Sequence, residues 1–331
     1  MTTSYSQRVR LFTVCLAALL TVVAAHASAA VILDSGGFES FTNTALAGQQ
    51  GWLMAGSATS TGTVQSSNVA AGSKAVRIDR GADSDARWAK LFSSTDFSME
   101  RYIRVSWDMN VLRSTTTPGL FGPFFGSEVY DEAAGFKLAG SLGVDAATGD
   151  VLYQAAGTGA LAETGATVGF NQWTHFEMLL DYTTQTYRGF MNGTPLFTQG
   201  FVDKANGGGP LTQFSDADIS ALAAAPDAGS RALTGTAFFD NFNVETLQAA
   251  DFNRDGAVDA LDLDIWEGAF GLNASGDANG NGKTDASDFL IWQRQFDGSA
   301  APALAASAAV PEPTACLLAL LPLLAACRRR K

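Results

Sequence analysis

The chain has 331 residues, of which 21 are lysine or arginine and 33 are aspartate or glutamate, so its formal net charge is −12. An acidic surface argues against nucleic acid as a partner, because a phosphate backbone attracts basic proteins. The three cysteines, Cys15, Cys316 and Cys327, lie in apolar segments near the two ends. The body of the chain therefore has neither a disulfide framework nor a cysteine nucleophile.

Residues 1–30 have the pattern of a secretory signal peptide. Arg8 and Arg10 supply the charged start, residues 11–25 the apolar core, and the stretch AHASAA the small residues of a cleavage region. An uncleaved membrane helix is the alternative, and the shortness of the apolar run argues against it. We therefore expect an exported protein.

Residues 31–248 are predicted to form a β domain. Apolar and polar residues alternate over residues 101–111 and again over 174–182, which is the period of a half-buried strand. Asn192-Gly193 separates two apolar runs, the strongest short signal for a hairpin. Only Ser215–Ala225 predicts a helix, with Ser215 as its N-cap. Many short strands with glycine-rich turns predict an antiparallel sandwich.

Four stretches of this domain resemble concanavalin A-like, laminin-G-like jelly rolls: GGFESF, GQQGW, WTHFEMLLDYTTQTYRGFMNG and FFDNFNVE. The resemblance covers about residues 31–247. It implies a jelly-roll sandwich, and it implies a polysaccharide or other extracellular glycan as the ligand.

The stretch EVYDE comes nearest to a catalytic pair of carboxylates. Glycoside hydrolases of this fold use two glutamates on one strand. Glu128, Tyr130 and Glu132 would share one face, so a tyrosine stands between the two glutamates. Four residues of strand separate that pair by roughly 13 Å, which is too wide for a retaining pair. We therefore expect no catalytic residue, and Glu128 and Glu132 are the candidates if the protein is a hydrolase.

Aromatic residues are the other candidates for contact with sugar. Trp52, Trp88 and Trp173 are the candidates for stacking on a ring, with burial in the core as the alternative, whereas Trp107 alternates in phase with the apolar face. His175 falls on the opposite side of its strand from the apolar residues, and no Gly-x-Ser-x-Gly elbow accompanies it. We expect His175 to be a surface residue.

Two twelve-residue stretches, Asp251–Asp262 and Asp277–Asp288, have the spacing of a calcium-binding loop. Both place side-chain oxygens at positions 1, 3, 5, 9 and 12 and glycine at position 6, while position 7 offers a carbonyl. The predicted ligands of two Ca²⁺ ions are Asp251, Asn253, Asp255, Asp259, Asp262, Asp277, Asn279, Asn281, Asp285 and Asp288, with the carbonyls of Ala257 and Lys283.

An apolar stripe follows each of these loops and repeats with a period of 26 residues. The two stripes are Leu263, Ile265, Trp266 and Phe270, and Phe289, Ile291, Trp292 and Phe296. This spacing predicts one helix after each loop, with the two apolar faces packed together. A solvated acidic linker is the alternative, but it has no reason to repeat both features.

The paired loops, each followed by one helix, resemble the type I dockerin of cellulosome-like systems. The resemblance implies a small α domain over residues 249–297 and a cohesin-like partner. Loop positions 10 and 11, which help to dock cohesin in that family, are Ala260 and Leu261 in one copy and Ala286 and Ser287 in the other. The usual hydroxyl pair is absent, which argues against cohesin binding and leaves the metal ligands in place.

A linker of small residues at 298–309 precedes the C-terminal segment 310–331. That segment has a Pro-Glu-Pro triplet, an apolar run of about 20 Å as a helix, and an arginine cluster. It resembles the PEP-CTERM sorting signal, which implies recognition and cleavage by an exosortase-type membrane protease. An uncut tail anchor is the alternative. The sorting residues would be Pro311, Glu312, Pro313, Arg328, Arg329 and Arg330.

These patterns predict a mainly β, antiparallel jelly-roll sandwich, a small α domain of two loop–helix repeats, and apolar helices at both ends. The expected protein is exported to the cell surface or extracellular matrix, binds calcium and a glycan, and is not an enzyme. One alternative is a laminarinase-like glycoside hydrolase that degrades polysaccharide and carries a dockerin. A structural matrix protein without a sugar ligand is the other.

Overall fold

The computed structural model describes residues 30–57, 59–90, 101–114, 120–132, 135–203 and 209–296. The predicted signal peptide up to residue 29, the linker and the sorting segment lie outside these residues. Within the described part, no helix is long and apolar enough to cross a membrane.

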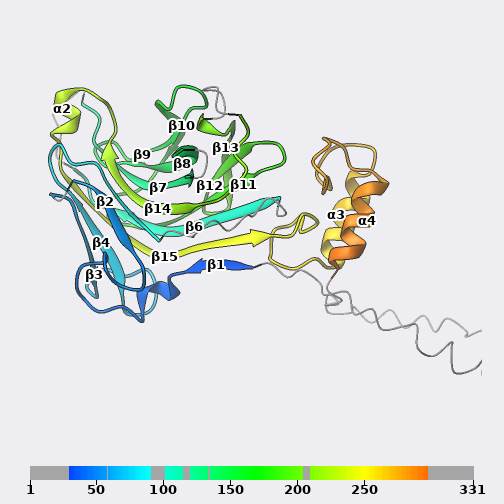
Figure 1. Ribbon diagram of the computed structural model, residues 1–331, viewed down its shortest axis with the longest axis horizontal. Coiled ribbons are helices and arrows are strands. Elements are labelled where there is room, and N and C mark those ends of the chain that lie inside the picture. The colour runs from blue at the N-terminus through cyan, green and yellow to red at the C-terminus, as the bar shows by residue number, and fades with distance from the viewer. Residues whose placement is uncertain are drawn as a thin grey trace, which may run out of the picture.

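Two antiparallel sheets face each other in a sandwich (Figure 1). The strands of the larger sheet are β1 (Val31–Asp34), β3 (Thr61–Gln65), β4 (Ala75–Arg80), β6 (Tyr102–Val111), β11 (Trp173–Asp181), β12 (Thr186–Met191), β13 (Thr194–Gly200) and β15 (Gly235–Leu247). These eight strands run in the order β13-β12-β11-β6-β15-β4-β3, and β1 pairs with β15.

Seven strands form the second sheet. They are β2 (Leu53–Gly56), β5 (Ala86–Ala89), β7 (Pro123–Asp131), β8 (Lys137–Asp145), β9 (Asp150–Gln154), β10 (Leu161–Thr167) and β14 (Asp216–Ala223). Their order is β10-β9-β8-β7-β14-β5-β2. The helical elements are η1 (Gly36–Phe38), α2 (Ala228–Arg231), α3 (Ala260–Ala269) and α4 (Ala286–Gln295). The prediction of a mainly β, antiparallel sandwich is confirmed.

The alternating stretches form strands as predicted. Residues 101–111 give β6, which pairs residue by residue with β11, the strand predicted at 174–182. Asn192 and Gly193 form the two-residue turn between β12 and β13. Their φ angles of 49° and 76° lie in the left-handed region that a tight hairpin of this twist requires.

The helix predicted at Ser215–Ala225 is wrong, because this stretch forms β14 between β7 and β5. Ala217, Ile219 and Ala221 join the core between the sheets. Asp216, Asp218 and Ser220 face the other side and are also buried. Both faces of this strand are buried, and its short alanines and serine gave a pattern that also suits a helix.

Aromatic side chains from distant segments meet in the core between the two sheets. Trp52 lies 6.0 Å from Phe38 and 5.9 Å from Phe242, measured between ring centroids. Trp107 lies 6.4 Å from Phe242 and stacks on Phe176 at 5.8 Å. The stretches GGFESF, GQQGW, WTHFEM and FFDNF each contribute one of these rings, so the motifs that carry the jelly-roll resemblance pack against one another.

Helices α3 and α4 contact each other in a reciprocal way. The Trp266 indole donates to the Asp285 carbonyl and the Trp292 indole donates to the Asp259 carbonyl, each at 3.0 Å. Asp259 and Asp285 are the N-caps of the two helices. Each tryptophan therefore holds the first turn of the other helix, and the shared apolar faces form a small core of their own.

Candidate functional site

A buried charged cluster lies on the outer face of the seven-stranded sheet. Glu128 on β7 and Asp218 on β14 stand directly opposite each other in the register. Their neighbours Val129, Ala217 and Ile219 point into the core, so the two carboxyl groups point away from it. Both acids are buried, and burial of a charge is costly unless it is paired and hydrogen-bonded.

Four side chains satisfy these two carboxyl groups. Arg87 Nε lies 2.6 Å from Glu128 and 3.7 Å from Asp218. The Ser220 hydroxyl contacts both acids, at 3.1 Å from Glu128. Tyr130 and Gln154 each donate to Glu128 at 3.2 Å. The cluster therefore holds one guanidinium, which is one-third exposed, over two carboxyl groups that do not reach solvent.

The surroundings of Asp216 and Asp218 on β14 favour the protonated forms of these two acids. Burial raises the pKa of Asp218 well above its ordinary value, and the neighbouring Glu128 charge adds to the effect. Burial likewise raises the pKa of Asp216 to about 7, with further contributions from Glu132 and Glu128. The Asp216 Oδ1 atom is buried without a hydrogen-bond partner, which agrees with a group that is easier to bury when neutral.

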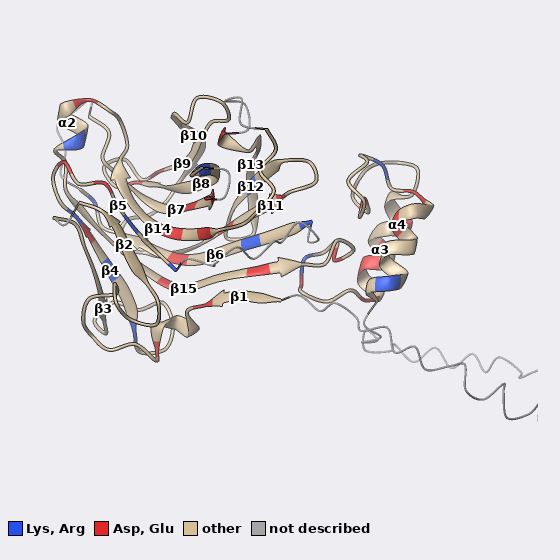
Figure 2. Cartoon of the chain, viewed as in Figure 1, with Lys and Arg blue, Asp and Glu red and all other residues tan. Residues whose placement is uncertain are grey.

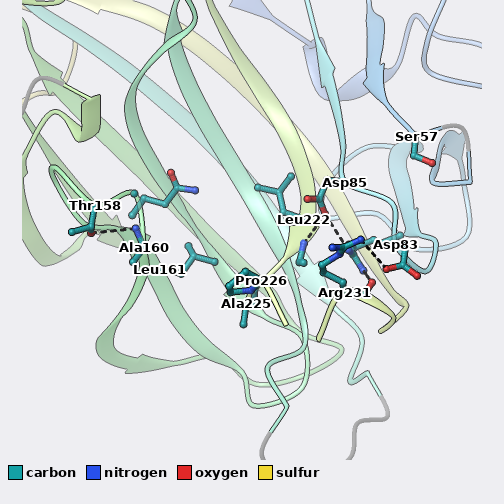
Figure 3. A pocket seen from close by; sticks show the side chains of 15 residues that line it. Ser57, Asp83, Asp85, Thr158, Ala160, Leu161, Leu222, Ala225, Pro226 and Arg231 are labelled. Carbon is teal, nitrogen blue, oxygen red and sulfur yellow. Dashed lines mark hydrogen bonds and ion pairs between the residues drawn. The ribbon is translucent and has the colours of Figure 1, made fainter. Parts of the chain in front are cut away.

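A cavity of about 800 Å³ lies at one end of the same sheet (Figure 3). Thr158 and Leu161 line one side of it, and Asp83, Asp85 and Arg231 line the other. Asp83 and Arg231 form an exposed ion pair at 3.4 Å. Asp85 accepts from the buried Arg80 guanidinium at 3.0 Å. The lining thus offers hydrogen-bond donors and acceptors at short separation.

Gln154 connects this cavity with the charged cluster. It lines the cavity and also donates to Glu128 Oε1. Figure 2 shows acidic positions gathered along β14, the strand that runs past both features. The cavity and the cluster therefore share one polar residue, and an apolar cluster of Phe124, Leu152 and Leu222 also contributes to the cavity wall through Leu222.

The structure places the predicted glutamates differently from a catalytic pair. Glu128 is fully buried, and the peptide N–H of Glu132 donates to the Ser215 hydroxyl at 2.8 Å. Sequence reasoning missed Arg87, Asp216 and Asp218, because the helix predicted at 215–225 concealed a strand. The alternation of acid and apolar residue in DADI was the signal that could have revealed β14.

Two of the three tryptophans proposed for sugar stacking are core residues. Trp52 and Trp88 are each 1% exposed, so neither offers a ring face to a ligand, and of the two alternatives they follow burial in the core. Trp173 is partly buried and donates to Asn68 at 3.1 Å. His175 is half-exposed and contacts Asp108 at 2.7 Å. It lies on the surface as predicted, because a strand turns successive side chains to opposite faces.

Both acidic loops have the same hydrogen-bond network. The position 1 carboxylates, Asp251 and Asp277, accept the peptide N–H groups of positions 5 and 6 at 2.9–3.2 Å. The position 12 carboxylates, Asp262 and Asp288, accept those of positions 2, 3 and 9 at 2.7–3.1 Å. Positions 9 and 12 also form a capping box at the start of each helix. The repeated grid of acids therefore folds both loops alike.

The donor set of the loops is made of oxygen atoms, as a hard cation requires. Among the described residues, no three His, Cys, Asp or Glu side chains converge as a metal-binding group, and the loop carboxylates accept peptide N–H groups instead. A carboxylate oxygen that accepts one N–H group keeps a second lone pair. Burial raises the pKa of Asp251 to about 6, with the charges of Asp262 and Asp255 adding to it. In the second loop, Arg101 lies 4.0 Å from the Asp277 carboxylate. The chemistry of the loops fits Ca²⁺.

No protein-family model matches the chain, and no curated protein is similar to it. Solved structures match only distantly. The chain is 15% identical to the cellulose-induced protein Cip1, with a TM-score of 0.45, covering 63% of this chain and 94% of Cip1. An endo-β-1,4-glucuronan lyase from the fungus Trichoderma reesei is 10% identical, with a TM-score of 0.41, covering 62% and 94%. A sialidase is 10% identical, with a TM-score of 0.45, covering 68% of this chain but 19% of the sialidase. At TM-scores below 0.5, these similarities identify neither a family nor an activity for this chain.

Because the pKa of Asp216 is raised in the folded protein, stability should depend on pH. The folded protein holds this proton more tightly than the unfolded chain, whose aspartate has a pKa near 3.8. Raising the pH from about 4 to about 7 therefore lowers the free energy of unfolding, and the loss is complete above about pH 7. Between pH 4 and pH 8, Asp216→Asn should lose roughly 1–3 kcal/mol less unfolding free energy than the wild type does. Urea unfolding of both proteins at both pH values measures this difference. Parallel pH profiles for variant and wild type would contradict this assignment.

Proposed function

We propose that the sandwich binds a neutral, hydroxyl-rich glycan in the cavity on the outer face of the seven-stranded sheet. The observation that carries the proposal is this cavity of about 800 Å³, with both donors and acceptors in its lining. Ligand sites are typically concave and of 300–1,000 Å³, with a few well-placed polar groups. Asp83 and Arg231 stand side by side at the rim, where a sugar hydroxyl can donate to one and accept from the other.

Charge in the cavity argues for a neutral ligand. Two arginines and two aspartates line it, and they pair as Arg80 with Asp85 and Arg231 with Asp83. An acidic or basic ligand would have to break one of these pairs, whereas a hydroxyl group can join them. The ligand is therefore recognised by hydrogen bonds, and the buried tryptophans take no part.

A glycan array followed by calorimetry on the best ligand tests this proposal. The double variant Asp83→Ala/Arg231→Ala should weaken binding at least about tenfold, because it removes two exposed groups that would contact the ligand, each worth about 1 kcal/mol or more. The matched control is Arg77→Ala/Asp79→Ala, an exposed ion pair at 2.8 Å that lies away from the cavity. Equal losses in both variants would overturn the cavity as the binding site. No glycan binding together with self-association would favour the structural matrix protein.

A polysaccharide-degrading glycoside hydrolase is the second candidate, favoured by the pairing of Glu128 with Asp218. Two carboxyl groups in different surroundings are the usual arrangement for acid–base catalysis. Here Arg87 stands beside Glu128, and burial favours the neutral form of Asp218. The burial of both acids argues against contact with a substrate. A non-catalytic role is therefore the primary proposal.

Assays on the same glycan panel distinguish the two candidates. We expect no turnover by the wild type, because the carboxyl groups that could act on a glycosidic bond are shielded from solvent. Turnover that is lost in Glu128→Gln, and separately in Asp218→Asn, would establish the hydrolase. Glu132→Gln serves as the matched control, since Glu132 directly follows β7 and its peptide N–H donates to the Ser215 hydroxyl, while its charge acts on Asp216.

The two acidic loops are proposed to bind one Ca²⁺ ion each. The first ion would be held by Asp251, Asn253, Asp255, Asp259 and Asp262 with the Ala257 carbonyl, and the second by Asp277, Asn279, Asn281, Asp285 and Asp288 with the Lys283 carbonyl. A bound cation would reduce the repulsion among the clustered carboxylates. The chemistry of the donor set and the identical folding of both loops support this proposal. A cohesin-like partner, export through the signal peptide and cleavage by an exosortase-type protease remain predictions from the sequence.

Calorimetry on single-loop variants tests the calcium proposal. The first loop has four carboxylates and the second has three, so the first should bind more tightly. Asp277→Ala should therefore leave the tighter site and Asp251→Ala the weaker one. Binding of two ions by the wild type, measured in chelator-treated protein, is the reference. Equal or reversed affinities would contradict the charge argument, and the absence of calcium binding would overturn the sites themselves.

A further inference from the structure

Both acidic loops lie against the end of the eight-stranded sheet rather than in solvent. Arg101 donates to the Asp277 carbonyl in the second loop, and Arg104 donates to the Arg254 carbonyl in the first, at 2.9 Å. Figure 1 shows the two helices beyond this end of the sandwich, and Figure 2 shows charged positions on β6 that approach them. Two arginines of one strand end thus each hold one loop.

The two arginines are fixed by acids of the sandwich. Arg101 pairs with Asp181 at 2.8 Å and Arg104 pairs with Glu245 at 2.5 Å. Their side chains are 9% and 19% exposed. A guanidinium held by one carboxylate presents its remaining N–H groups in a fixed direction. The carbonyls that accept these groups belong to loop positions 1 and 4, whereas a calcium loop of this spacing uses the carbonyl of position 7. Docking therefore uses other carbonyls than cation binding, although Arg101 also lies 4.0 Å from the Asp277 carboxylate, a predicted calcium ligand.

The two copies of the loop differ at position 4, where they meet the sheet. Arg254 in the first copy lies over the Phe190 ring at 4.4 Å and 3.7 Å from Glu177. Gly280 in the second copy leaves room for Thr183, because an added Cβ would lie 2.6 Å from the Thr183 methyl group. Arg254 adopts a φ of 63°, which costs an arginine more than a glycine. The first loop accepts this cost and gains the contacts with the sandwich.

We propose that the loop–helix pair docks on the sandwich through Arg101, Arg104 and Arg254, and that this docking strengthens cation binding by both loops. This inference rests on the proposed calcium sites. A cation fixes the loop backbone, and the fixed backbone presents the Asp277 and Arg254 carbonyls to the sandwich. Linkage is reciprocal, so if a bound cation strengthens docking, docking strengthens cation binding by the same factor. A variant that loosens docking must therefore weaken cation binding.

The sign of the effect separates this proposal from simple electrostatics. Replacing an arginine near a cation site removes a repulsive charge, which by itself strengthens cation binding. Arg254→Gly also relieves the left-handed backbone, as the second copy already does at Gly280. Both effects predict tighter binding, and only the loss of docking predicts weaker binding.

Calcium titrations of the full chain by calorimetry test the proposal, with hydrogen exchange as a second measurement. Arg254→Gly should weaken calcium binding about threefold or more, and Arg101→Gln/Arg104→Gln about tenfold, within the usual range of coupling between sites. Calcium should also protect the peptide N–H groups of Thr183 and Thr184 in the wild type, since the loop covers this turn, and should fail to do so in the double variant. Arg77→Gln is the control for loss of an arginine on the sandwich.

Each outcome decides one point. Weaker calcium binding by Arg254→Gly supports the coupling. This variant changes no residue of the sandwich, so it still tests the proposal if the double variant does not fold. Unchanged or tighter calcium binding in Arg254→Gly and in a folded double variant overturns the coupling while the calcium sites stand. If the wild type binds no calcium, the proposed sites fail and the coupling fails with them.

Discussion

The packing of aromatic rings between the two sheets is the constraint on which the rest of this structure depends. Trp52 and Phe38 come from the N-terminal loops, Trp107 and Phe176 from central strands, and Phe242 from the last strand of the sandwich. Large rings bury much apolar surface and hold their neighbours at defined angles. They fix how the first and last segments close the sandwich, and so determine which side chains are left for the outer faces.

The outer face of the seven-stranded sheet carries the side chains that do not point into this core. Successive side chains of a strand point to opposite faces of the sheet. Because β14 supplies Ala217, Ile219 and Ala221 to the core, its Asp216 and Asp218 side chains point outward. Those acids are nonetheless buried, and Arg87 supplies the nearby positive charge. Burying several acids beside a single guanidinium costs free energy unless protons neutralise them. Such a cost is more often retained for a function than for stability.

Local periodicity was enough to predict β6, β11, the β12–β13 hairpin and the presence of one helix with each loop, although α3 and α4 begin within the loops, at Ala260 and Ala286. It failed at β14, because alanine and serine suit a strand covered on both faces as well as a helix. It also could not decide between ligand and core for Trp52 and Trp88. A tryptophan in a loop motif has no period, and only the closing of the sandwich shows that both rings point inward.

The charged cluster was beyond sequence reasoning for a different reason. Arg87, Glu128 and Asp218 come from three strands that are far apart in the chain and adjacent only through the sheet order. The acidic loops are the opposite case, since all their acids act within twelve residues. For this reason, the hydrogen-bond network of the loops follows directly from their spacing, whereas their contact with Arg101 and Arg104 does not.

The reciprocal tryptophans of α3 and α4 have a consequence for how this segment can be divided. Each indole donates to the first turn of the other helix, so either repeat on its own would have a Trp N–H and an N-cap carbonyl without each other. The smallest cooperative unit is therefore the pair, joined like the two halves of a symmetric dimer within one polypeptide. Separated repeats from two chains could restore the same bonds between molecules, which makes exchange of a helix between neighbours the natural form of misassembly for this segment.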